Sequence, residues 1–140
     1  MIASVLLAII LVGFGTLVAA IVLTSIFYYK AWKQIQDGYQ RTSAGKAVGF
    51  CFIPIFHFYW MFVAAHGLAQ DINSYLRRNK IAVPEVSEGL ALAFSILFVV
   101  SFVPILGYFT GVGVLVTGLI LMHQVKVASM AIAKFKSPGA

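Results

Sequence analysis

The sequence predicts an all-α, polytopic membrane protein, and its composition and charge distribution are the observations that predict it. Of its 140 residues 61% are hydrophobic and 10% are charged, which leaves too little polar surface to cover a water-soluble core. The ten Lys and Arg residues fall in three places, 30–46, 77–80 and 126–136. Basic residues that flank membrane spans are held on the cytoplasmic side, so these clusters also constrain the topology. The net charge of +6 indicates contact with anionic lipid headgroups, and no nucleic-acid partner is expected.

The first apolar segment, residues 2–29, is predicted to be a membrane-spanning helix. It carries no charged side chain and exceeds the roughly 20 residues that cross about 30 Å of hydrocarbon. It lacks a basic n-region and its apolar run is long for a signal peptide, so a permanent anchor is expected. Tyr28, Tyr29 and Trp32 follow at its end and are typical of the aromatic belt at a membrane interface.

The last two apolar segments are predicted to be separate helices at about 87–103 and 105–134. The stretch from Gly89 to Gln124 is uncharged for 36 residues, and one straight helix of that length would be about 54 Å long. Pro104 removes a helix hydrogen bond and therefore supplies the bend. The whole chain, 1–140, is interpreted as a single membrane domain with three crossing helices plus a fourth apolar segment, 47–70, that bends at Pro54.

Two topologies remain open for the segment 47–70. If it crosses, four basic residues lie on one side of the membrane and six on the other, so the charge distribution scarcely selects an orientation. If it enters and returns to the same face as a re-entrant hairpin, all ten basic residues become cytoplasmic. A re-entrant backbone is tolerated only where protein or a wet cavity surrounds it, which would imply an oligomer or a partner subunit.

The candidate ligand residues are the three histidines, since ionisable groups in apolar segments indicate function by default. His57, His66 and His123 could ligate haem iron or a chlorophyll magnesium. His57 and His66 lie nine positions apart and would point in opposite directions on one helix, so a pair would need His123 from another helix. The alternative is that His57 and His66 form hydrogen bonds to neighbouring helices and that His123 lies at the membrane interface beside Gln124 and Lys126, and no cofactor or metal site is expected. Asp71 and Asn73 could bind a cation, but capping and interface anchoring fit them better.

Catalysis is not expected. All four carboxylates lie in loops or at helix ends, so no buried acidic pair can relay protons or cleave a bond within the membrane. The stretch from Gly38 to Lys46 superficially resembles a phosphate-binding loop. Its glycine spacing is wrong and Ala47 stands where Ser or Thr is needed, which excludes nucleotide binding there.

Small residues on two helices are predicted to be helix-packing contacts. Gly107 and Gly111 lie four apart on one face, with Gly118 seven residues further, and the first helix carries Gly15 and Ala19. Such spacing lets another helix approach closely. The neighbour could be a helix of the same chain or one of another subunit.

Residues 31–73, AWKQIQDGYQRTSAGKAVGFCFIPIFHFYWMFVAAHGLAQDIN, resemble a pattern in a family of uncharacterised bacterial integral membrane proteins. In that family a basic turn with Thr and Gly-Lys precedes a Phe-Ile-Pro segment. Tyr59, Trp60, Asp71 and Asn73 have counterparts there, whereas His57 more often corresponds to Asn. The resemblance covers about a third of the chain and implies a multi-pass location in the bacterial cytoplasmic (inner) membrane without an assigned activity.

The function expected from these observations is that of a non-catalytic small membrane subunit that packs onto, stabilises or assembles a larger complex. Its expected partners are membrane lipids and either other integral membrane subunits or further copies of itself. An alternative is a subunit that bears a haem- or chlorophyll-type cofactor for electron or energy transfer. A small-solute carrier is less favoured because the spans offer few polar side chains.

Overall fold

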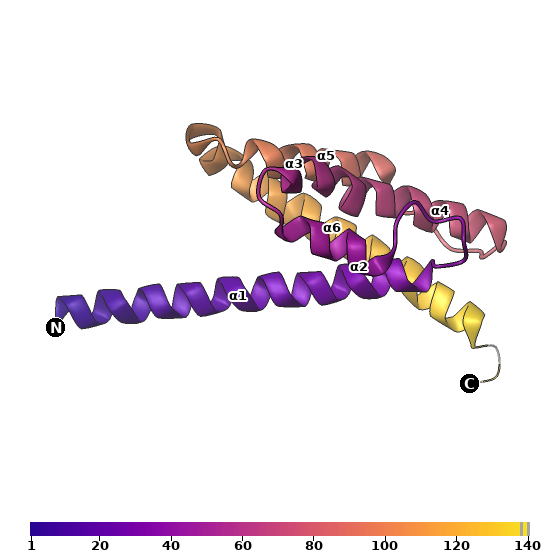
Figure 1. The fold of residues 1–140 in the computed structure, drawn as a ribbon, viewed down its shortest axis with the longest axis horizontal. Coiled ribbons are helices and arrows are strands. Elements are labelled where there is room, and N and C mark those ends of the chain that lie inside the picture. The colour runs from indigo at the N-terminus through magenta and orange to yellow at the C-terminus, as the bar shows by residue number, and fades with distance from the viewer. Residues whose placement is uncertain (138, 140) are drawn as a thin grey trace.

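The computed structural model describes residues 1–137 and 139, and over these residues the chain is all-helical. Two 33-residue helices, α1 (Ile2–Gln34) and α6 (Pro104–Lys136), dominate the fold (Figure 1). Each is long and apolar enough to cross a membrane, in agreement with the predicted class. The third predicted crossing is not confirmed. The helix α5 (Glu88–Val100) has 13 residues and is about 20 Å long, shorter than the roughly 30 Å of hydrocarbon in a bilayer.

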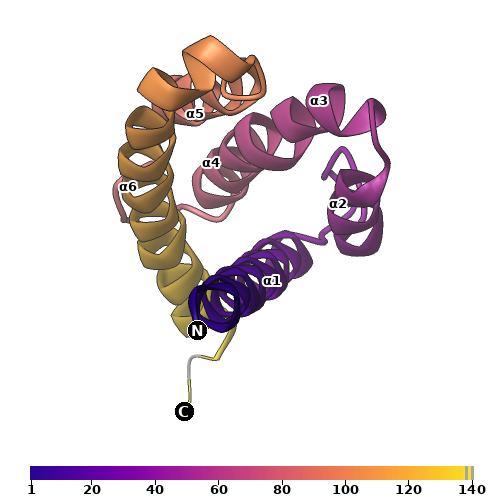
Figure 2. The same cartoon turned by 90° about the vertical axis from the view of Figure 1, so that its left-hand side faces the viewer.

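The segment between α1 and α5 folds as a hairpin, which we call the central hairpin (residues 44–78). Its elements are α2 (Ala44–Gly49), the 3₁₀ turn η1 (Phe50–Phe52), α3 (Phe56–Met61), the π-helical turn η2 (Phe62–Gly67) and α4 (Leu68–Arg78). The chain reverses direction between η1 and α3, so α4 runs back past α2 (Figure 1). Seen along α1 in Figure 2, α4 lies between α6 and α2.

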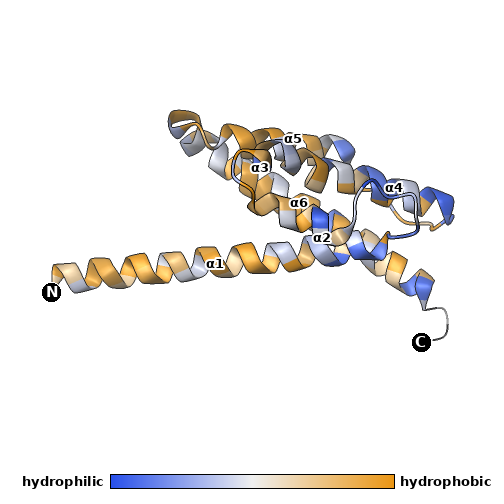
Figure 3. Ribbon diagram, viewed as in Figure 1, coloured by the Kyte–Doolittle hydropathy of each residue, from blue (hydrophilic) through white to orange (hydrophobic). Residues whose placement is uncertain are grey.

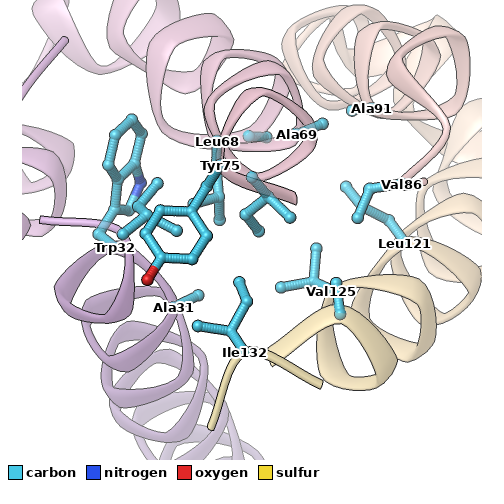
Figure 4. Close-up of a cluster of buried hydrophobic side chains, with 14 of the residues drawn as sticks. Ala31, Trp32, Leu68, Ala69, Tyr75, Val86, Ala91, Leu121, Val125 and Ile132 are labelled. Carbon is cyan, nitrogen blue, oxygen red and sulfur yellow. The ribbon is translucent and has the colours of Figure 1, made fainter. Parts of the chain in front are cut away.

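The hydrophobic core lies where the end of α1, α4 and the C-terminal half of α6 meet (Figure 4). Helix α4 is amphipathic, and its buried residues recur at the helical spacing of Leu68, Ile72 and Leu76. Trp32, which the sequence placed at the membrane interface, is instead fully buried in this core. An indole ring buries more apolar area than any other side chain, so it stabilises this junction strongly.

Outside that core the surface is strongly apolar. None of the most apolar part of α1 is buried, and its leucine, isoleucine and valine side chains are exposed from Ile2 to Leu23. The turn between α5 and α6 and the start of α6 are also exposed and apolar, with Tyr108 of α6 86% accessible. Hydrophilic residues gather at the opposite end, around α4 and the ends of α1 and α6 (Figure 3). An exposed apolar surface of this extent is typical of contact with lipid or with other membrane helices.

Helices α5 and α6 pack closely against each other through glycines. A Cβ atom at Gly107 would lie 2.0 Å from the carbonyl oxygen of Ser101, and one at Gly118 would lie 3.0 Å from the ring of Phe94. Gly107 and Gly118, two of the predicted packing residues, therefore pack against their own chain. Gly111 and Gly15, in contrast, have no atom within 4 Å of an added Cβ.

Candidate functional site

The central hairpin reverses at a turn of three residues, Pro54 to Phe56. The N–H group of Phe56 donates to the carbonyl of Pro54 at 2.7 Å, and Ile55 has φ 66° and ψ −55°. These angles are those of a γ-turn with positive φ, which is rare and strained for a β-branched residue. The predicted bend residue Pro54 thus lies in the turn, and Pro104, the other one, is the first residue of α6. The positive-φ conformation of Ile55 allows the chain to reverse within three residues, at the cost of local strain.

The tip of the hairpin forms most of its backbone hydrogen bonds within itself. The N–H of Ile53 donates to the carbonyl of Phe50 at 3.3 Å, and that of His57 donates to Ile53 at 2.9 Å. Pro54 has no N–H group to satisfy. The imidazole Nδ1 of His57 bonds the carbonyl of Cys51, a group that the turn would otherwise leave open. A tip with internally paired polar groups costs little free energy in an apolar environment.

Two tryptophan side chains form hydrogen bonds to the hairpin backbone: Trp60 joins its two arms, and Trp32 joins the hairpin to α1. The indole N–H of Trp60 donates to the carbonyl of Ala47 at 2.8 Å and so joins α3 to α2. The indole N–H of Trp32 donates to the carbonyl of Ala64 at 3.3 Å and so joins α1 to η2. A π-helical turn displaces its carbonyls from the regular α-helical pattern, and such turns occur frequently at functional sites.

Three ion pairs hold the loops together at the hydrophilic end, which we call the basic cap. Arg41 lies 3.0 Å from Asp71, Arg78 lies 2.6 Å from Asp37, and Arg77 lies 2.9 Å from Glu85. Partial burial alone would raise the pKa of Asp37, but the hydrogen bond and charge of Arg78 hold that pKa below its ordinary value. Each of the three arginines is thus paired with a carboxylate. Within the described residues no lysine takes part in an ion pair.

The two polar residues after the second apolar segment have different roles, Asp71 in the basic cap and Asn73 in the core. Asp71 accepts hydrogen bonds from the backbone N–H and the Nε of Arg41, each at 3.0 Å. Asn73 is buried, and its amide both donates to the carbonyl of Val86 and accepts from the N–H of Val86, each at 2.8 Å. The amide also donates to Glu88 at 3.1 Å. Asn73 therefore ties the connection between α4 and α5 to the core.

A pocket of about 540 Å³, the inner pocket, lies between α1, the central hairpin and the end of α5. Its polar side chains are Thr24, Ser25 and Tyr28 on α1 together with Cys51 and His57 on the hairpin. The rest of its lining is apolar and comes from Leu17, Ala20, Ile21, Ala47, Val48, Phe52, Met61, Ala64, Phe98 and Phe102. A volume of this size falls within the range of small-molecule sites, roughly 300 to 1,000 Å³.

The three histidines lie on three different elements. His57 lines the inner pocket and packs its ring 5.3 Å from that of Phe98, His66 is half-buried on η2, and His123 is exposed on α6. In the part of the chain that the structure describes, no three His, Cys, Asp or Glu side chains are grouped as a metal site would need. Sequence reasoning missed the hydroxyl groups of the pocket, because single Thr and Ser residues in an apolar helix give no periodic signal.

Comparisons of the chain with known protein families, with curated proteins and with solved structures found no match. The resemblance of residues 31–73 to a bacterial membrane family stays a prediction.

Proposed function

We propose that this chain is a non-catalytic, multi-pass integral membrane subunit of the bacterial cytoplasmic membrane that packs onto a larger membrane complex and stabilises or assembles it. The observation that carries the proposal is the position of α1. Its N-terminal end projects past the other helices (Figure 1), and its most apolar part buries no side chain in the chain's own core. A protein helix on this surface would gain packing contacts that the chain itself does not supply.

The two faces of α1 differ in a way that supports a protein neighbour on one of them. The face toward the bundle lines the inner pocket with Leu17, Ala20 and Ile21. At 100° per residue, Gly15 and Ala19 lie about 180° around the helix from that face. Both are exposed, and an added Cβ at Gly15 meets no atom within 4 Å. We call the face of Gly15 and Ala19 the outer face and assign the partner helix to it.

For the topology we propose that the central hairpin re-enters the membrane from the cytoplasmic side. Its first arm, α2 with η1, is about 15 Å long, which is half the hydrocarbon thickness of a bilayer. The ion pair between Asp37 and Arg78 places the loops before and after the hairpin together. All ten basic residues then lie on the cytoplasmic side, and the charge-free turn before Pro104 faces outward.

The topology predicts that single cysteines introduced as Gly38→Cys and Asn79→Cys, in a Cys51→Ala background, react with a membrane-impermeant thiol reagent only from the cytoplasmic side. The reason is that both positions flank the ion pair of Asp37 with Arg78. Tyr108→Cys, in the exposed start of α6, serves as the control and should react only from outside. Reaction of Asn79→Cys from outside would contradict a re-entrant hairpin and indicate a fourth crossing.

The assembly proposal predicts that Gly15→Leu lowers the native mass of the detergent-solubilised protein toward that of the 15.2 kDa monomer. A leucine on the outer face prevents the close helix approach that the glycine permits, at a cost of about 1 to 3 kcal/mol. The matched control is Gly13→Leu, which is equally open in the chain but lies about 160° away around the helix. Equal native masses for the two variants would remove the outer face from the partner contact.

A further inference from the structure

We propose that the inner pocket binds a membrane-dissolved quinol, a neutral six-membered ring that carries hydroxyl groups at two opposite edges. The hydroxyl groups of α1 hold one edge of this ring, and Nε2 of His57 accepts a hydrogen bond from the other edge. The inference rests on the membrane location in the proposed function and needs no partner subunit.

The inner pocket is walled by stripes of side chains at helical spacing. On α1 the lining residues within 17–28 recur at i, i+3, i+4, i+7, i+8 and i+11, which is one face of a helix. The two arms of the central hairpin add faces within 47–52 and 57–64, and Phe98 with Phe102 complete the wall. The lining, all of it within the described residues, contains no Lys, Arg, Asp or Glu. The pocket therefore suits a neutral molecule.

The α1 wall offers hydroxyl groups that the chain itself does not use. Thr24, Ser25 and Tyr28 line the pocket, and among the described residues their hydroxyls form no hydrogen bond. Other hydroxyls in the apolar helices donate to the carbonyl one turn back, as those of Thr16 and Ser95 do. A hydroxyl without a partner in an apolar environment costs free energy. An acyl chain would leave these three groups unpaired, whereas a ring oxygen can bond them.

The hairpin wall offers a hydrogen-bond acceptor. Nδ1 of His57 bonds the carbonyl oxygen of Cys51, and because a carbonyl can only accept, Nδ1 carries the proton. In the neutral imidazole Nε2 then has a lone pair and accepts a hydrogen bond. The hydroxyl of a quinol can donate to Nε2, but the carbonyl of the oxidised quinone cannot. The pocket therefore favours the reduced form of such a ring over the oxidised form.

The remaining lining suits a flat ring with apolar substituents. Phe52, Phe98 and Phe102 present aromatic surface from the hairpin and from the end of α5. The ring centroid of Phe98 lies 5.3 Å from that of His57 and 5.4 Å from that of Phe102. Aromatic rings pack favourably in tilted and edge-to-face arrangements at such separations, so a ligand ring can extend this cluster. Met61 and the aliphatic side chains of α1 match its apolar substituents.

The test is equilibrium dialysis of the full-length chain in detergent micelles against the same micelles without protein, which corrects for uptake of the ligand by detergent. The ligands are duroquinol, duroquinone and durene. They share one tetramethyl ring and carry two hydroxyls, two carbonyls and no oxygen, respectively. Under nitrogen, the wild-type chain should bind duroquinol about tenfold more tightly than duroquinone, because one hydrogen bond to Nε2 distinguishes them. Durene should bind more weakly than either.

Variants of α1 test the hydroxyl wall. Thr24→Val, Ser25→Ala and Tyr28→Phe, combined in one chain, remove the three hydroxyls with little change in volume. This triple variant should bind duroquinol at least about tenfold more weakly than the wild type does. The matched control combines Thr16→Val with Tyr29→Phe, two exposed residues of α1 that do not line the pocket, and it should bind like the wild type.

A variant of His57 tests the acceptor. His57→Phe removes Nε2 but keeps a ring beside Phe98, so it should bind duroquinol and duroquinone with equal affinity. Because the two affinities are compared within one preparation, a misfolded fraction does not change their ratio. Helical circular dichroism is measured for each variant, and if His57→Phe loses helix content the triple variant of α1 decides.

Three outcomes would overturn the proposal. They are equal wild-type affinity for durene and duroquinol, equal duroquinol affinity in the triple variant and its matched control, and an unchanged preference for duroquinol in a folded His57→Phe. The proposed function fails in different measurements, the native mass of Gly15→Leu and the thiol labelling of Asn79→Cys, so the failures are distinguishable.

Discussion

Replacing Gly107 with alanine is expected to disrupt the turn that joins α5 to α6. The new Cβ would lie 2.0 Å from the carbonyl oxygen of Ser101, which is a backbone atom and cannot rotate away. Relief requires the first turn of α6 to move, and overpacking of this kind costs about 3 kcal/mol or more. That cost exceeds the gain of about 1 kcal/mol that alanine otherwise brings when it replaces glycine inside a helix.

The measurement is thermal unfolding in detergent micelles, followed by circular dichroism. Gly111→Ala is the matched control, since it lies one helical turn further along α6 and has no atom within 4 Å of an added Cβ. The control should unfold at the wild-type temperature or slightly above it, because it keeps the helical gain without the clash. Coincident unfolding curves for the two variants would show that Ser101 does not lie against Gly107.

Replacing Asn73 with leucine is expected to cost about 2 to 5 kcal/mol of folding free energy. Leucine has a similar volume, so the core is not opened. Its side chain forms no hydrogen bonds, however, and the N–H and carbonyl of Val86, both bonded to Asn73 at 2.8 Å, would become unsatisfied in a buried position. Buried polar groups without partners cost about 1 to 3 kcal/mol each.

Denaturation of the purified protein in mixed micelles, with helicity as the signal, gives this free energy. Asn79→Leu provides the comparison, because Asn79 is half-buried at the end of α4 and, among the described residues, its amide bonds only the carbonyl of Tyr75. We expect a loss below about 1 kcal/mol there. An equal loss of folding free energy in Asn73→Leu and Asn79→Leu would contradict this expectation. It would show that the backbone groups of Val86 become hydrated when Asn73 is lost.

The helical class and the break between α5 and α6 could be predicted from hydropathy because both depend on length. An uncharged stretch of 36 residues is too long for one crossing, and Pro104 is its natural interruption. The reversal of the central hairpin depends on one backbone conformation, that of Ile55. A β-branched residue rarely adopts positive φ, so no sequence pattern indicates a turn there.

The candidate site was less predictable, since it is assembled from residues distant in the chain. Asp37 and Arg78 pair across 41 positions, and hydropathy carries no information about such a contact. His57 was identified as a possible ligand from its apolar surroundings alone. Its hydrogen bond to the carbonyl of Cys51, six residues away, depends on the conformation of the turn. The sequence predicted a bend at Pro54 but not this conformation. Trp32 follows an apolar helix, and at that place in the sequence a tryptophan at the membrane interface looks the same as one buried in the core.

The first and last helices meet in the same core, where Ala31 of α1 lies beside Ile132 of α6 and Lys136 bonds the carbonyl of Gln34. During synthesis this core cannot close until α6 has left the ribosome. Until then α4, with its apolar stripe, has no partner on one side and is open to chaperones and proteases. A chain truncated before Ile132 would therefore be exposed to degradation, even though α1 has already been synthesised.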